Sequence, residues 1–107
     1  MTEQKKTRRE LLEDFVANKP DDAFSRYGLA MEYMNSGNPA AADKQFQALL
    51  ERNADYIPAY LMYGQFLARE SRTDEAKQVL SNGIAAAAKM RNEHARSEME
   101  TLLKDLS

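Results

Sequence analysis

The sequence lacks several of the residue types on which protein chemistry and β-structure depend. Its 107 residues include no cysteine, no tryptophan, one histidine, four glycines and three prolines. Without cysteine the chain can form no disulfide, no cysteine-ligated zinc site and no thiol nucleophile. Valine and isoleucine together supply only four residues. Because sheets are built largely from β-branched side chains, this composition predicts an all-α protein.

The sequence also lacks an excess of charge of either sign. Seventeen acidic and fifteen basic residues give a formal net charge of −2. Phosphate binding needs a basic face, so no nucleic-acid partner is expected. The one basic run, Lys5–Arg9, is followed at once by acidic residues. On a helix, Lys6–Glu10 and Arg9–Glu13 would be i,i+4 pairs, which predicts a solvated, self-paired face.

Long apolar runs are missing as well. No stretch approaches the ~18–20 apolar residues that a helix needs to span a bilayer. The charges near the N-terminus are followed by no apolar segment of the kind found in a secretory signal. We therefore expect no membrane association and a cytoplasmic protein.

Alanine and leucine dominate the apolar residues that are present. Hydrophobic residues make up 43% of the chain, and 16 of them are alanine and 11 leucine. Short polar turns divide the chain into segments with helical apolar spacing. These segments predict six helices at residues 5–18, 22–36, 39–53, 56–70, 74–90 and 93–106.

The turns carry recognisable helix-capping residues. Gly37 is placed to end one helix, and Asn38 to cap the next, with Pro39 in its first turn. By the same reasoning Asp55, Thr73 and Asn92 are predicted N-caps.

The central helices show a gapless repeat of 34 residues. The matched pairs are Leu29 and Tyr63, Ala30 and Gly64, Tyr33 and Leu67, Gly37 and Ser71, Ala42 and Ala76, Phe46 and Leu80, Leu49 and Gly83, and Leu50 and Ile84. Stepping back by the same offset places Phe46 on Leu12 and Leu50 on Val16, so the first helix is half of an earlier repeat. A period of this length indicates stacked helix–turn–helix units that share a core.

This pattern resembles the tetratricopeptide repeat, and in particular small bacterial proteins of that family. The first repeat matches at Leu29, Ala30, Tyr33, Ala42 and Phe46, and the second at Tyr60, Tyr63, Gly64, Leu67, Ala76 and Leu80. The sequence departs from the pattern at Arg26, which replaces a large aromatic residue, and at Ala54 and Ala88, which replace prolines. The resemblance implies an α-solenoid of antiparallel helix pairs, with one domain at 1–107. Its parts are a half repeat at 5–18, repeats at 23–56 and 57–90, and a capping helix at 92–106.

Small residues predict where the helices pack most closely. Gly83 would cost ~1 kcal/mol relative to alanine inside an exposed helix, so a neighbouring helix is expected to pack against it. The run Ala85–Ala88 predicts a close-packed seat for the last helix. Both end helices are expected to carry charged outer faces and so to cap the array.

The resemblance implies that a ligand, usually a peptide, lies in a concave groove lined by the first helix of each repeat. By position, the groove residues would be Phe24, Tyr27, Met31, Met34, Asn35, Leu61, Gln65 and Arg69. Tyr27 and Met31 stand where a clamp for a C-terminal carboxylate would have lysine and asparagine, so no such clamp is expected. A strip rich in methionine and aromatic residues suggests an apolar partner segment.

Two functions follow from this strip, and the sequence leaves both open. The first is a non-catalytic module that binds a peptide or helix of another protein in the groove. The second is a homodimer formed through the same apolar strip. A third reading is that Phe24, Tyr27 and Met31 simply pack against the half repeat at 5–18.

Catalytic and cofactor-binding motifs are not found. The sequence contains no P-loop, dinucleotide-binding glycine motif or nucleophile elbow. His94 and Glu98 are i,i+4 neighbours, but two ligands without a third make no metal site. We therefore expect no enzyme activity, no metal and no cofactor.

Overall fold

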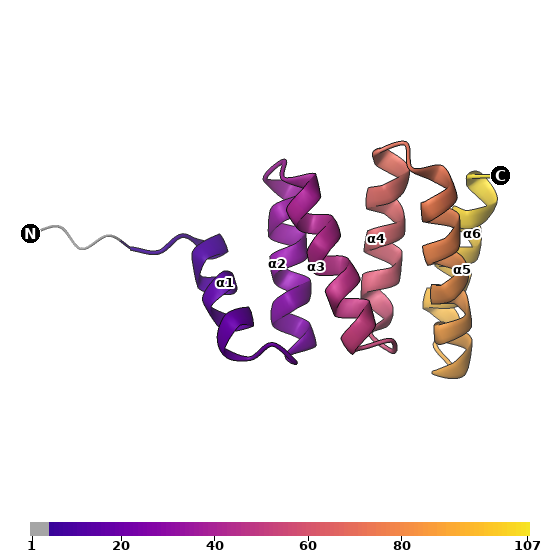
Figure 1. Ribbon diagram of the computed structural model, residues 1–107. Coiled ribbons are helices and arrows are strands. Elements are labelled where there is room, and N and C mark those ends of the chain that lie inside the picture. Colours follow the sequence, from indigo (N-terminus) through magenta and orange to yellow (C-terminus); the bar gives the residue numbers. More distant parts are fainter. Residues whose placement is uncertain (1–4) are drawn as a thin grey trace, which may run out of the picture. The chain divides into compact units, whose positions relative to one another are not determined.

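The computed structural model describes residues 5–107, and its regular elements are all helices. They are α1 (Arg8–Asn18), α2 (Ala23–Asn35), α3 (Pro39–Arg52), α4 (Ile57–Arg69), α5 (Thr73–Lys89) and α6 (Glu93–Asp105). The chain divides between Arg52 and Asn53 into two compact units, one holding α1–α3 and the other α4–α6 (Figure 1). The six predicted helices are confirmed, and α1 alone begins as much as three residues from its predicted start. Residues 1–4 of the predicted domain lie outside the described residues, and the repeat bounds 23–56 and 57–90 stay a prediction.

In the first unit α2 packs against both α1 and α3. Its apolar core includes Leu29, Ala30, Ala42 and Phe46, none of which is more than 2% exposed. Helix α1 adds one buried residue, Val16. The predicted close-packing role of Ala30 and Ala42 is therefore consistent with their complete burial.

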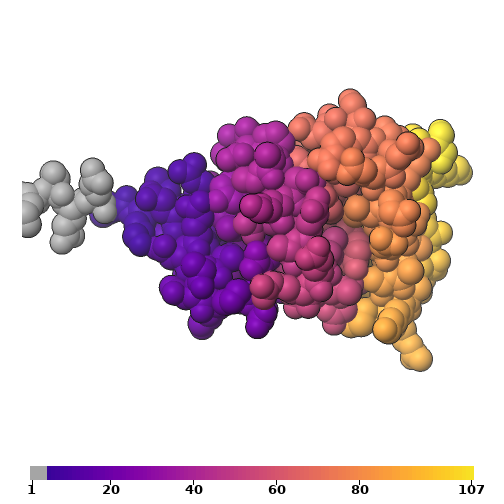
Figure 2. All heavy atoms as spheres, viewed as in Figure 1, coloured from indigo at the N-terminus to yellow at the C-terminus, as the bar shows by residue number. Residues whose placement is uncertain are grey.

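In the second unit two glycines mark the closest helix approaches. A Cβ atom on Gly64 would lie 2.6 Å from Cδ2 of Leu80, and one on Gly83 would lie 2.5 Å from Cβ of Tyr60. The Gly83 position would also meet Sδ of Met99 at 2.6 Å, so α5 is packed between α4 and α6 at this point. In the space-filling view the three helices form one closely packed body (Figure 2). The prediction for Gly83 is confirmed.

The alanine run of α5 differs from expectation. Ala87 is completely buried, but Ala85 and Ala88 are exposed. A helix repeats every 3.6 residues, so four consecutive alanines cannot all face one neighbour. One alanine of the run, and Gly83 one turn earlier, are the buried positions.

Three helices end in the same left-handed turn. The residue after each C-cap has a positive φ: 75° at Gly37, 62° at Ser71 and 57° at Arg91. The backbone N–H of the next residue then donates to a carbonyl five residues earlier, from Asn38 to Tyr33 (2.9 Å), Arg72 to Leu67 (2.9 Å) and Asn92 to Ala87 (2.8 Å). This is the Schellman arrangement, which satisfies carbonyls that the helix leaves unpaired. The predicted helix stop at Gly37 is confirmed.

Two of the predicted N-caps are confirmed and two are wrong. The Oδ1 atoms of Asn38 and Asn92 accept backbone N–H bonds from residues three positions ahead, at 3.4 and 3.1 Å. Asp55 does not cap α4, because the helix starts two residues later. Thr73 does not cap α5, because it is itself the first helical residue.

Helix α1 has an N-terminal cap that the sequence reading missed. The Thr7 hydroxyl accepts from the Glu10 backbone, and the Glu10 carboxylate accepts from the Thr7 backbone, which completes a capping box. The hydrogen bond from the Thr7 backbone to the Glu10 carboxylate lowers the pKa of Glu10. Lys6 pairs with Asp14 rather than with the predicted Glu10.

Candidate functional site

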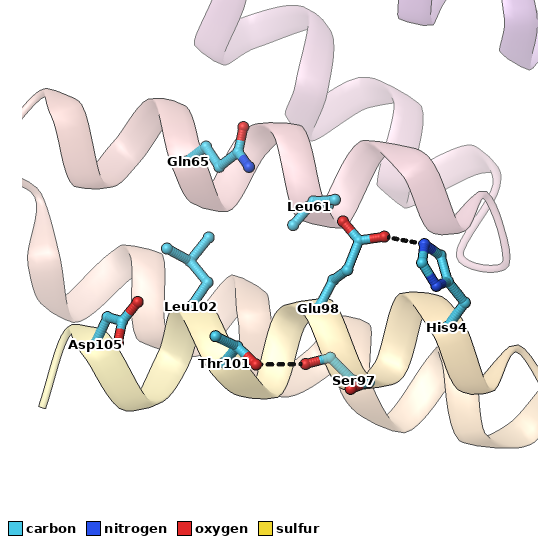
Figure 3. A pocket seen from close by; sticks show the side chains of 8 residues that line it. All are labelled: Leu61, Gln65, His94, Ser97, Glu98, Thr101, Leu102 and Asp105. Carbon is cyan, nitrogen blue, oxygen red and sulfur yellow. Dashed lines mark hydrogen bonds and ion pairs between the residues drawn. The ribbon is translucent and has the colours of Figure 1, made fainter.

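An open groove of about 320 Å³ separates parts of α4 and α6 in the second unit (Figure 3). Leu61 and Leu102 point into it from opposite walls. Its lining residues are Leu61, Gln65, His94, Ser97, Glu98, Thr101, Leu102 and Asp105. The groove therefore has an apolar side chain on each wall and polar margins.

The margins of this groove are acidic. Glu98 and Asp105 lie on α6, and neither lysine nor arginine is among the lining residues. The imidazole Nε2 of His94 is 2.6 Å from Oε1 of Glu98, and both side chains are exposed (Figure 3). The Thr101 hydroxyl donates to the Ser97 carbonyl at 3.0 Å and so follows the helix backbone. The groups of the groove that would attract a cation are the carboxylates of Glu98 and Asp105.

A second hollow, of about 460 Å³, lies between α1 and α2 in the first unit. It is lined mainly by apolar and aromatic side chains: Arg8, Leu12, Phe15, Phe24, Ser25, Tyr27, Gly28 and Met31. Phe24 is 75% exposed and Phe15 is 54% exposed. Neighbouring Leu11 on α1 is 49% exposed, so the apolar surface continues beyond the hollow.

Polar contacts hold α1 against α2 beside this hollow. The Tyr33 hydroxyl donates to the Glu13 carboxylate, and Nε of Arg8 lies 3.3 Å from Oε2 of Glu32. Partial burial, and then the contact with Glu13, raise the pKa of Tyr33. These contacts fix the orientation of α1 about its own axis, and so decide which of its residues point away from α2.

A third cavity, of about 350 Å³, lies in the second unit near the start of α4 and the end of α5. It is lined by Ala54, Asp55, Tyr60, Ala85, Ala86, Lys89 and Met90. The Tyr60 hydroxyl donates to the Ala54 carbonyl at 2.5 Å, and burial raises the pKa of Tyr60. The Tyr60 hydroxyl thus holds the loop before α4 by a hydrogen bond.

Across residues 5–107, no three histidine, aspartate or glutamate side chains are grouped so that they could hold a metal ion. His94 and Glu98 are in contact on an exposed helix face, as i,i+4 neighbours commonly are. Within the same residues, the helices are too short or too polar to cross a bilayer.

Comparison with known proteins identifies the fold. A Pseudomonas aeruginosa protein named as TPR repeat-containing is 30% identical over 97 residues, which cover 89% of this chain and 90% of that protein. The chain belongs to the tetratricopeptide repeat family. This family's fold generally serves as a protein–protein interaction module. No protein-family model matches the chain.

Solved structures of tetratricopeptide repeat proteins agree with this identification. A solution structure of a tetratricopeptide repeat domain protein from Salinibacter ruber has a TM-score of 0.79 at 30% identity, and the match covers 83% of this chain and 90% of that one. A crystal structure of a Salinibacter ruber domain gives 0.73 at 30% identity, over 79% and 94%. A Bordetella parapertussis protein, at 24% identity and a TM-score of 0.79 over 95% and 89%, shares the fold. The predicted family and the all-α fold of antiparallel helix pairs are confirmed.

The predicted tetratricopeptide groove residues fall into three groups. Phe24, Tyr27 and Met31 come together in the hollow between α1 and α2, and Leu61 and Gln65 line the groove between α4 and α6. Met34, Asn35 and Arg69 line none of the three cavities. Whether any of the eight residues binds a partner stays a prediction.

Sequence reasoning missed the α6 wall of the groove. Ser97, Thr101 and Asp105 follow Leu61, Gln65 and Arg69 by 36 residues, two more than the repeat period. Helix α5 has 17 residues and α3 has 14, so the register of the next helix is shifted. Reading the last helix as the first helix of a further repeat, with this shift, would have found these positions.

Helix α1 also differs from the prediction that both end helices carry charged outer faces. Arg96 of α6 pairs with Glu93 and Glu100, so the outer face of α6 is charged as expected. Helix α1 exposes Leu11 and Phe15 beside charged residues such as Arg8. Four apolar residues, at 11, 12, 15 and 16, are too many for one short helix to bury against a single neighbour.

Proposed function

We propose that the protein is a non-catalytic interaction module that binds a segment of another protein in the groove between α4 and α6. The observation that carries this proposal is the open groove itself, where Leu61 and Gln65 of α4 face Leu102 of α6. Binding surfaces for peptides commonly combine apolar side chains with polar groups that fix orientation. The groove has both.

The chemistry of the groove favours a particular partner segment. Leu61 and Leu102 would take an apolar side chain, whose burial supplies the affinity. Glu98 and Asp105 are seven residues apart on α6, about 10 Å along the helix, and would each attract a cation. The proposed ligand is therefore a short segment with a lysine or arginine next to an apolar residue.

Peptide selection against the purified protein tests this function. We expect the enriched peptides to carry basic residues beside apolar ones. A Glu98→Lys/Asp105→Lys variant should lose about tenfold or more in affinity, because two attractive charges become repulsive. Leu61→Ala should weaken binding as well. Titration calorimetry with one selected peptide measures both effects.

Glu100→Lys is the matched control, since Glu100 lies on the same helix, pairs with Arg96 and does not line the groove. Its change of charge equals that of Glu98→Lys measured alone, and it should leave the affinity within about twofold, because an exposed charge outside the contact contributes little. Equal losses for Glu98→Lys and Glu100→Lys would exclude the groove as the binding site.

A further inference from the structure

We infer that the exposed apolar surface of α1 and the start of α2 is a homodimer interface, in which α1 packs antiparallel to α1 of a second copy. This interface, defined by Leu11, Phe15 and Phe24, is separate from the groove proposed above to bind a partner. It does not depend on that proposal.

The surface is unusually apolar for one in contact with water. Leu11, Phe15 and Phe24 are 49%, 54% and 75% exposed, and the hollow between Phe15 and Phe24 is open. Exposed apolar side chains that cluster in one place mark interaction sites, whereas scattered ones are ordinary. Leu11 and Phe15 are one turn apart, which makes them a continuous seam along α1.

The charges of α1 favour a second copy as the occupant. The basic residues Lys5, Lys6, Arg8 and Arg9 precede the acidic Asp14 along the chain, whereas the carboxylates of Glu10 and Glu13 are bound to Thr7 and Tyr33. In an antiparallel pair related by a two-fold axis, the basic end of one helix lies beside the acidic end of the other. The same sequence then attracts itself at both ends of the seam.

Arg8 and Asp14 are the residues best placed to make these contacts. Their side chains are 75% and 48% exposed, and they lie on either side of Leu11 along the helix. Arg8 now lies near Glu32, and Asp14 pairs with Lys6, but exposed pairs of this kind are weak and exchange readily. A two-fold interface also uses each apolar residue twice, so three side chains from each copy form a six-residue core.

Sedimentation equilibrium of the full chain tests the dimer. We expect the wild type to dimerise with a Kd below about 10⁻⁴ M. Phe15→Asp should raise this Kd about thirtyfold or more, because a central apolar anchor is replaced by a charge. Met90→Asp is the matched control, since Met90 is 52% exposed but lies on the second unit, and it should leave the Kd unchanged. Circular dichroism shows whether each variant is folded, and Leu11→Ser replaces Phe15→Asp if that chain does not fold.

A mixing experiment separates a second copy from any other occupant. Arg8→Glu and Asp14→Arg should each weaken self-association, because each places like charges opposite one another in the two-fold pair. When the two variants are mixed, every altered charge faces an opposite one, so the mixed dimer should regain the wild-type Kd within about threefold.

A wild-type monomer at about 0.5 mM, well above the expected Kd, would overturn the inference. So would a dimer that Phe15→Asp leaves intact, or single-charge variants that do not recover on mixing. Glu98→Lys/Asp105→Lys should not alter dimerisation. Loss of peptide binding and loss of the dimer can therefore be told apart.

Discussion

Arg26 and Tyr60 occupy the same position in the two repeats, 34 residues apart. Each donates a hydrogen bond to the backbone carbonyl at the equivalent position of its own repeat, one through a guanidinium and the other through a hydroxyl. Nη2 of Arg26 donates to the Pro20 carbonyl at 3.1 Å, and the Tyr60 hydroxyl donates to the Ala54 carbonyl at 2.5 Å. The two acceptors are also 34 residues apart. What the repeat requires here is a long side chain that reaches the loop before its first helix. An aromatic ring is one way to supply it.

The two solutions differ in what they require of their surroundings. Cβ of Tyr60 lies 2.5 Å, and its first ring carbon Cγ 2.9 Å, from where a Cβ on residue 83 would lie, so that position is glycine. The corresponding residue of the first repeat is Leu49, which is completely buried. Arg26 brings a charge into a position that is 8% exposed, and its Nε has no hydrogen-bond partner. Burial, with Arg52 nearby, lowers the pKa of its guanidinium.

The largest expected effect is that of Gly83→Leu, which gives the second repeat the residue of the first. The new side chain would overlap Cβ of Tyr60, which cannot move without shifting α4, and Sδ of Met99, whose side chain is completely buried. We expect a loss of about 3 kcal/mol or more in the free energy of unfolding, measured with urea. Ser81→Leu, on an exposed face of α5, should change it by less than about 0.5 kcal/mol. Similar losses in both variants would mean that the close contact at Gly83 is unimportant.

The second prediction concerns the charge of Arg26. Arg26→Ala removes the bond to Pro20 and a 2.9 Å bond to Oε1 of Gln45, together with the packing of the side-chain stem. We expect a loss of about 2–3 kcal/mol. Arg26→Met keeps the stem and removes the buried charge, so it should cost about 1 kcal/mol or less. If Arg26→Met cost as much as Arg26→Ala, the hydrogen bonds rather than the stem would hold the first repeat together.

The third prediction uses the Tyr60 hydroxyl. Tyr60→Phe removes one hydrogen bond and should cost about 1 kcal/mol at pH 7. Because burial raises the folded-state pKa of Tyr60, its proton is bound more tightly in the folded chain. This contribution to stability is complete below the unfolded pKa of about 10 and is lost as the pH rises through the folded value.

Denaturation between pH 8 and the alkaline limit checks this dependence. The Tyr60→Phe variant should lose less stability with rising pH than the wild type does. Tyr33, whose pKa is also raised, supplies an independent part of the slope, and a double variant with Tyr33→Phe should be flatter still. A slope unchanged in Tyr60→Phe would contradict the assigned shift.

Most of the fold could be predicted from the sequence because small residues and turn residues recur at fixed positions of the repeat. Gly83 and Ala30 marked close approaches, and Gly37 marked a helix end. Helices α4 and α5 start within one residue of their predicted starts, but their N-cap residues could not be predicted, since Tyr56 and Arg72 occupy these positions without a side-chain cap bond. Tyrosine and arginine are not preferred N-cap residues, so the residue types at these two positions do not indicate a helix start, and packing sets the boundary.

The candidate site was less accessible to sequence reasoning. Leu61 and Gln65 follow from repeat position, but the opposite wall of their groove depends on the length of α5. Phe24, Tyr27 and Met31 were predicted as one strip, and their hollow also needs Phe15 of α1, whose exposure the amphipathic pattern did not reveal. Exposure depends on how many neighbours a helix has, and a single sequence does not state that number.

The smallest expected effects concern the left-handed turns, where glycine stands in one repeat and other residues elsewhere. Ser71 and Arg91 hold φ values of 62° and 57°, a conformation that costs a residue with a Cβ roughly 1 kcal/mol and glycine almost nothing. Ser71→Gly and Arg91→Gly should each stabilise the protein by about 0.5–1 kcal/mol, which corresponds to a rise of about 2–6 °C in Tm. Gly37→Ser should destabilise it by a similar amount.

Ser81→Gly distinguishes a local backbone effect from a general effect of glycine. Ser81 is an exposed residue inside α5 with ordinary helical geometry, so glycine there should lower the stability by up to about 1 kcal/mol. If Ser71→Gly raises the stability and Ser81→Gly lowers it, the positive φ is a feature of the repeat's turn that costs serine backbone strain. If both variants lower the stability, contacts of the Ser71 side chain outweigh the backbone strain of its turn. The two repeats would then stabilise this turn differently, as they do the loop that Arg26 and Tyr60 contact.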